Sequence, residues 1–179
     1  EPLSTNYFGE GFVEQDPEAI YQNVIAAVKN CLDDFLAKGF NAVHIAAIGI
    51  SNQRETFVVW DKNGQPLHPA IVWQCKRSAA VCAELNHAGH APLIEQKTGL
   101  KVDPYFSATK LIWLQQNKPA VATAIQNGKA FFGTIDTWLL FRLSKGTAYA
   151  TDYTNASRTL FFNLHTLQWD QELIQLYGL

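Results

Sequence analysis

The chain has 179 residues, of which 47% are hydrophobic and 17% are charged, and its formal net charge at pH 7 is -2. This composition excludes disordered, collagen-like and low-complexity proteins, and a chain of this length can bury roughly 70% of its unfolded surface without a disulfide or metal. The balanced charge lacks the basic surface that a general binder of nucleic acid or acidic membranes needs. No apolar run approaches the ~20 residues that cross a bilayer. We therefore expect a globular protein that binds neither nucleic acid nor membrane.

The cysteines indicate a reducing compartment. Cys31, Cys75 and Cys82 are odd in number and sparse, which is typical of reduced thiols rather than of a disulfide framework, so we expect a cytoplasmic location. Cys82, His87 and His90 have no fourth partner at zinc-like spacing, so no metal site is predicted. The sequence contains no methionine, which favours a processed, trimmed or partial chain.

The first predicted element is a helix between Asp16 and Gly39. Asp16 is a good N-cap, Pro17 suits the first helical position, and Gly39 suits the C-terminal end. Between them, apolar residues recur at steps of three and four and form one stripe. The residues before this helix show no period and are interpreted as an irregular connection.

A sheet is predicted next. Residues 43–50 are almost wholly apolar, which favours a strand that is covered on both faces, as in an α/β sheet. Residues 56–61 and 70–73 predict two further strands, and Asn63-Gly64 between them favours a two-residue hairpin turn.

The remainder alternates helices with short connections, so the fold class is mixed α/β. Residues 97–104 are interpreted as a polar connection because Pro104 biases the residue before it away from helix. Five helices and one brief strand are predicted by their periodicity: helices at residues 78–87, 109–116, 120–126, 135–143 and 169–177, and the strand at residues 130–132.

Arg54 and Glu55 are the first candidates for chemistry. They follow the predicted buried strand, and ligands of open α/β sheets bind at the carboxyl ends of strands. The guanidinium offers donors in a fixed fork and the carboxylate offers only acceptors, so together they could hold a vicinal pair of hydroxyls. Both can reach one ligand only where the strand has ended, because neighbours in a strand point to opposite faces. An ordinary ion pair in a solvated turn also explains the two residues.

Two aromatic residues and one polar stretch complete the candidates. Trp73 could cover the carbon side of a polyol, although on sequence alone a plain core aromatic is the favoured interpretation. Tyr105 carries a phenol that can donate or accept, although its loop also suits a helix cap. For residues 152–159 a structural role is favoured, because Asn, Asp and Ser are common in turns. No G-x-S-x-G elbow or Walker-type phosphate loop occurs in the sequence.

Several blocks of the sequence resemble the FGGY carbohydrate kinases, and among them the glycerol kinases. The blocks are residues 49–56, 70–77, 103–110, 132–139 and 151–159. The resemblance implies a ribonuclease-H-like, actin-like ATPase fold of the α/β class, with a mixed sheet flanked by helices. It also implies that the γ-phosphoryl group of ATP is transferred to a terminal hydroxyl of glycerol with Mg²⁺. By position, Arg54, Glu55 and Tyr105 would hydrogen-bond the hydroxyls of glycerol, and Trp73 would line its carbon backbone.

Two parts of the family's pattern are absent from the sequence. An Asp-x-Gly-Thr-Thr phosphate loop would precede Glu1, and the general-base aspartate and the ATP-binding second domain would follow Leu179. We therefore expect residues 1–179 to form part of the amino-terminal domain, with no catalytic, cofactor or metal residue of their own. Such a stretch should not catalyse alone and should leave one flank of its sheet uncovered.

Two alternative functions and the oligomeric state stay open from the sequence. The chain could belong to an FGGY kinase for another polyol or sugar, or to a non-catalytic, polyol-binding pseudo-kinase. The full-length form could be a homo-oligomer.

Overall fold

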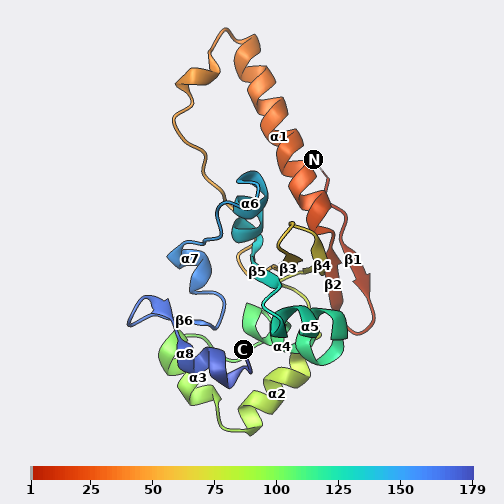
Figure 1. The fold of residues 1–179 in the computed structure, drawn as a ribbon, viewed down its shortest axis with the longest axis vertical. Coiled ribbons are helices and arrows are strands. Elements are labelled where there is room, and N and C mark those ends of the chain that lie inside the picture. The colour runs from red at the N-terminus through yellow and green to blue at the C-terminus, as the bar shows by residue number, and fades with distance from the viewer. Residues whose placement is uncertain (1) are drawn as a thin grey trace.

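The structure is a computed structural model and describes residues 2–179. Its centre is a five-stranded sheet in the order β1-β2-β4-β3-β5, and every neighbouring pair in it is antiparallel. The strands are β1 (Asn6–Phe8), β2 (Phe12–Gln15), β3 (Phe57–Asp61), β4 (Pro66–Ile71) and β5 (Ala130–Thr134). The expected α/β class is confirmed, since helices pack on both faces of this sheet (Figure 1). The expected mixed sheet is corrected, because all neighbouring strands within residues 2–179 are antiparallel.

β3 shows why both faces are covered. Its side chains alternate, so Phe57 and Val59 enter one buried cluster while Val58 and Trp60 enter the other. The first cluster contains residues of helices α3, α4, α5 and α8, and the second is closed by α6 and the start of α1. A hairpin turn is confirmed at this place, but its loop has three residues, 62–64, rather than two. The backbone N–H of Asp61 donates to the carbonyl of Gln65, the N–H of Gly64 donates to the carbonyl of Asp61, and Gly64 has a φ of +76° that an L side chain rarely adopts.

The predicted helices are all present. In chain order the helices are α1 (Pro17–Ala37), α2 (Ala79–His87), α3 (Ala91–Thr98), α4 (Ser107–Asn117), α5 (Pro119–Gln126), α6 (Ile135–Leu143), α7 (Tyr153–Ala156) and α8 (Gln171–Leu176). The elements that the sequence did not predict are α3, α7, the opening strands β1 and β2, and a small hairpin of β6 (Phe162–Asn163) and β7 (Gln168–Trp169). These strands and α7 are short and carry little periodic signal.

α1 is long and largely unpacked. Its N-cap is confirmed, because the Asp16 carboxylate accepts a 2.9 Å hydrogen bond from the backbone N–H of Glu18. Only Pro17 and Ile20 of the helix are buried, and the helix projects beyond the sheet in Figure 1. Three of its apolar side chains, Ile25, Val28 and Leu36, are exposed.

The predicted strand at residues 43–50 is wrong. The structure has a short 3-10 turn at Ala42–His44 and then an extended chain that belongs to no sheet (Figure 1). Every residue from 36 to 51 is exposed. A strand is stable only beside another strand, and within residues 2–179 none pairs with this segment. The apolar side chains of residues 43–50 are of the kind that a protein normally buries, but in the structure they are exposed.

The three cysteines are all free thiols. Cys31 is exposed, and Cys75 and Cys82 are buried. Over residues 2–179, no helix combines the length and the apolar character that crossing a bilayer requires.

Candidate functional site

The four predicted site residues lie in three turns at one end of the sheet. Arg54 and Glu55 occupy the turn that leads into β3, and Trp73 lies just past the end of β4. Because β3 and β4 are antiparallel and Phe57 pairs with Ile71, the beginning of β3 lies beside the end of β4. The arginine and glutamate therefore precede a strand rather than follow one, which corrects the predicted placement. They are in a turn, so the alternation of a strand does not force their side chains apart.

Tyr105 joins these turns from the segment before α4. Its ring and the ring of Trp73 meet edge to face, with centroids 5.7 Å apart. Burial raises the pKa of the Tyr105 phenol, and the nearby carboxylate of Glu55 raises it further, while Arg54 and Arg158 act in the opposite sense. The phenol therefore lies close to both charged candidates. The structure brings all four predicted residues into one cluster around Tyr105.

Glu55 is almost fully buried, and its charge is paired. Its side chain is 6% exposed, and Oε1 accepts a 2.7 Å hydrogen bond from Nε of Arg158. The guanidinium of Arg158 also lies over the ring of Phe106, 5.0 Å from the centroid. Arg158 was not among the predicted site residues, because the stretch at residues 152–159 was interpreted as structural. The dense polar character of that stretch was the available signal.

The turn that carries Glu55 is tied to other parts of the chain. The amide of Asn52 donates to Oδ1 of Asn155 over 3.0 Å, and the amide of Gln53 donates to Oε1 of Gln15 over 3.3 Å. Among residues 2–179, Arg54 makes no hydrogen bond or ion pair, and it is exposed. The turn is thus fixed in place while it presents a guanidinium that is free to meet a ligand.

A buried carboxylate supports the same turn. Asp136 accepts 2.5 Å hydrogen bonds from the hydroxyls of Thr134 and Thr151, and the amide of Asn52 lies 3.5 Å from its Oδ1. The carboxylate links the start of α6 to residue 52. This packing explains how distant elements set the position of Glu55.

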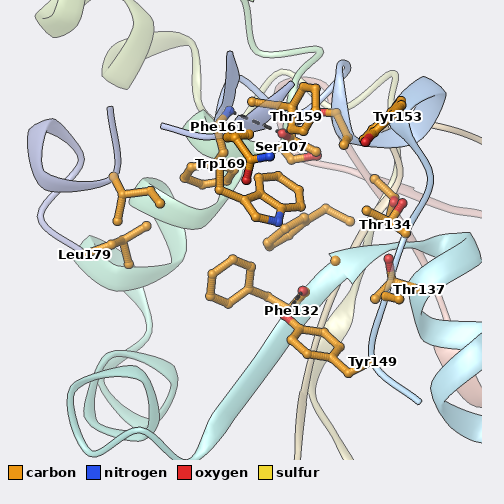
Figure 2. Close-up of a pocket in the computed structure, with 18 of the residues that line it drawn as sticks. Ser107, Phe132, Thr134, Thr137, Tyr149, Tyr153, Thr159, Phe161, Trp169 and Leu179 are labelled. Carbon is orange, nitrogen blue, oxygen red and sulfur yellow. Dashed lines mark hydrogen bonds between the residues drawn. The ribbon is translucent and has the colours of Figure 1, made fainter. Parts of the chain in front are cut away.

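One cavity is separate from this cluster. It has a volume of about 570 Å³, and Figure 2 shows Phe132, Tyr149 and Trp169 gathered about it. None of its lining residues is charged, and none of the four predicted site residues lines it. Within residues 2–179, the hydroxyl of Ser107, another lining residue, has no hydrogen-bond partner. With no charged group, this cavity has nothing to neutralise a phosphate.

The chemistry available to the cluster is that of hydroxyl binding. Arg54 offers donors, Glu55 offers an acceptor oxygen beside the one that Arg158 occupies, and the phenol of Tyr105 can do either. Trp73 is 38% exposed and presents an apolar ring beside them. The described residues, 2–179, contain no group of three or more His, Cys, Asp and Glu side chains that could hold a metal ion.

Comparisons with known proteins point to one family of kinases. The model of the FGGY family of carbohydrate kinases, N-terminal domain, matches residues 1–179. A glycerol kinase of Pseudomonas entomophila is 48% identical over 178 residues, which are 99% of this chain and 35% of that protein. A glycerol kinase of Symbiobacterium thermophilum is 50% identical over 171 residues, covering 94% of this chain and 34% of that protein.

Solved structures give the same fold. The crystal structure of Plasmodium falciparum glycerol kinase with ADP superimposes with a TM-score of 0.88 at 37% identity, over 99% of this chain and 35% of that one. A ligand-bound xylulose kinase of Lactobacillus acidophilus superimposes with a TM-score of 0.83 at 28% identity, over 100% of this chain and 34% of that one. The expected actin-like fold is therefore confirmed. The chain spans about a third of the length of the relatives it matches.

Proposed function

The chain belongs to the FGGY family of carbohydrate kinases, and from this premise we propose that it supplies the glycerol-binding part of an ATP-dependent glycerol kinase. The full-length protein would transfer the γ-phosphoryl group of ATP to a terminal hydroxyl of glycerol. Relatives at 48% and 50% identity carry the name glycerol kinase, which supports this substrate over a larger sugar.

One observation carries the proposal: the phenol of Tyr105 lies near the charges of both Arg54 and Glu55 and its ring packs against Trp73. In the proposed complex, Arg54 donates to one hydroxyl of glycerol and Glu55 accepts from another. Tyr105 binds a hydroxyl from the side, and the indole of Trp73 covers the carbon backbone. Binding of this kind orients the attacking hydroxyl, which is what phosphoryl transfer chiefly requires of a protein.

ATP and Mg²⁺ belong to the proposed reaction, but residues 2–179 do not fit them. These residues form no carboxylate cluster for a metal, and the sequence has no glycine-rich phosphate loop. We therefore assign both groups, and the general base, to parts of the protein beyond those described. The contribution of residues 2–179 is to bind glycerol and orient its hydroxyls.

A second candidate is a kinase for a larger polyol or sugar. It is favoured by the structural likeness to xylulose and gluconate kinases of Lactobacillus acidophilus, each at 28% identity. A pseudo-kinase that binds a polyol without turnover is the third possibility. Both would use the same cluster around Tyr105.

Calorimetric titration of the full-length protein separates these candidates. Glycerol should bind, and Arg54→Ala should weaken that binding by at least about tenfold. Tighter binding and faster phosphorylation of xylulose or gluconate would establish the second candidate. Binding of glycerol with no phosphoryl transfer in the presence of ATP and Mg²⁺ would establish the third.

The proposal also covers the cellular location and the oligomeric state of the full-length protein. The three free thiols support a cytoplasmic protein, because the cytoplasm keeps cysteines reduced. A homo-oligomeric full-length form stays a prediction.

A further inference from the structure

Lys110 breaks two local rules of protein structure. Its side chain is fully buried, at 0% exposure, although lysine is almost never buried completely unless it is paired. It also lies in the first turn of α4, where the helix dipole disfavours a positive charge. A residue that opposes both burial and the dipole is expected to serve a function that offsets the cost.

The contacts of Lys110 lead to the candidate site. Its ammonium group donates a hydrogen bond to the backbone carbonyl of Tyr105, and this is its only side-chain hydrogen bond within residues 2–179. On the other side of the same residue, the backbone N–H of Tyr105 donates to Oδ1 of Asp103 over 2.8 Å. The peptide groups on both sides of the Tyr105 Cα atom are thus fixed by side chains.

The charges that face Lys110 come from several elements. Glu55 in the turn before β3 and Asp103 in the turn before α4 both favour the charged amine, and the thiols of Cys75 and Cys82 lie close to it. Burial outweighs these groups and lowers the pKa of Lys110 to about 7. The buried amine therefore keeps its hydrogen bond to the Tyr105 carbonyl as its one side-chain anchor within residues 2–179.

We propose that Lys110 is a positioning residue for the glycerol site, which holds the backbone carbonyl of Tyr105 in place. This inference rests on the proposed function. Lys110 need not touch the substrate. It sets where the phenol of Tyr105 stands against Glu55, one of whose oxygens is already occupied by Arg158. Without the amine, the turn at Asp103–Phe106 loses its hydrogen bond from the Lys110 side chain.

The test is titration of the full-length protein with glycerol and, separately, with ADP. Lys110→Met keeps an unbranched side chain of nearly the same length and removes the amine, and Lys110→Gln keeps a hydrogen-bond donor and removes the charge. We expect Lys110→Met to raise the Kd for glycerol by about tenfold or more, and Lys110→Gln to raise it less. The Kd for ADP should stay within about twofold, because the proposal assigns the nucleotide to other parts of the protein.

Thr98→Val is the matched control. Thr98 is also buried on a helix. Its hydroxyl donates to the carbonyl of Ile94 over 2.7 Å and accepts from the backbone N–H of Leu100 over 3.2 Å, so the variant removes side-chain to backbone hydrogen bonds that lie outside the cluster. It should lower the melting temperature and leave the Kd for glycerol unchanged. A merely structural role for Lys110 would make its variants behave like this control.

The outcomes separate the two proposals. If the wild-type protein binds glycerol and a folded Lys110→Met or Lys110→Gln variant binds it equally well, the role of Lys110 is overturned while the proposed function stands. If glycerol and ADP weaken together in the variants, the effect is general and the role is again overturned. If the wild-type protein does not bind glycerol, the proposed function is overturned, and the inference with it.

Discussion

Nε of Arg158 donates a 2.7 Å hydrogen bond to Oε1 of Glu55, across 103 residues of the sequence. The carboxylate is nearly buried and the guanidinium is partly exposed, with side-chain exposures of 6% and 27%. A buried carboxylate needs a partner, because ionised groups lose more from desolvation than any other side chain. The polar stretch that ends at residue 159 thus places a charge against the candidate site.

Arg158→Met should destabilise the 179-residue chain by about 1.5–3 kcal/mol, because it leaves Glu55 buried without its hydrogen-bonded partner. Glu55→Gln should cost less in the Arg158→Met background than in the wild type, because the orphaned charge is then gone. Urea unfolding of the wild type, both single variants and the double variant measures the coupling. A coupling energy near zero would contradict the pairing.

Arg54→Ala should leave the stability of the chain nearly unchanged but should reduce activity. Arg54 is exposed and makes no hydrogen bond or ion pair within the described residues, so the free energy of unfolding should change by less than about 0.5 kcal/mol. In the full-length enzyme, kcat/KM for glycerol should fall by an amount equivalent to about 1–3 kcal/mol of transition-state binding. The control is Lys62→Ala, which also removes an exposed cation, but from the far end of β3. Unchanged kinetics in Arg54→Ala would remove this residue from the site.

Sequence alone predicts what depends on local pattern. The cap at Asp16 and the stripe that follows it define α1, and Asn63-Gly64 defines the hairpin, because capping and turn geometry are properties of a few adjacent residues. Arg54, Glu55, Trp73 and Tyr105 could also be named, but mainly through the resemblance to a family. Their convergence depends on the pairing of β3 with β4, which no local pattern encodes.

What the sequence did not predict depends on contacts between residues that are far apart in the chain. Residues 43–50 have the composition of a buried strand, but composition does not say whether a partner strand is present. Likewise, the roles of Lys110 and Arg158 depend on contacts with Tyr105 and Glu55. Neither contact can be predicted from the helical or polar pattern of the neighbouring sequence.

The exposure of the apolar residues at 43–50 can be tested by substitution. Val43 and Ile48 are 80% and 75% exposed, so Val43→Lys and Ile48→Lys should leave the free energy of unfolding of the chain within about 0.5 kcal/mol of the wild type. Self-association should decrease, because an exposed apolar segment promotes it. Light scattering over a concentration series, with Gln126→Lys as a control that adds the same charge at an exposed polar position, measures this. A loss of about 2 kcal/mol or more would show that these side chains are buried.

The buried amine of Lys110 predicts how stability depends on pH. Its pKa is about 7 in the folded chain against 10.5 for an ordinary lysine, so between these values the unfolded chain binds more protons than the folded one. Stability should therefore rise with pH above about 7, by up to about 1.4 kcal/mol per pH unit, and below that pH the amine is charged in both states and adds no slope.

Urea unfolding of the wild type and of Lys110→Met between about pH 6 and pH 9 isolates this contribution, because most other groups titrate alike in the two proteins. The range stops there because burial raises the pKa of Cys82 from 9.0 to about 11, and that shift lowers stability as pH rises above 9.0. The difference in unfolding free energy between wild type and variant should be flat below about pH 7 and should shift in favour of the wild type above it. Parallel curves across the whole range would mean that the Lys110 amine keeps an ordinary pKa, and that the protein does not bury it as the structure describes.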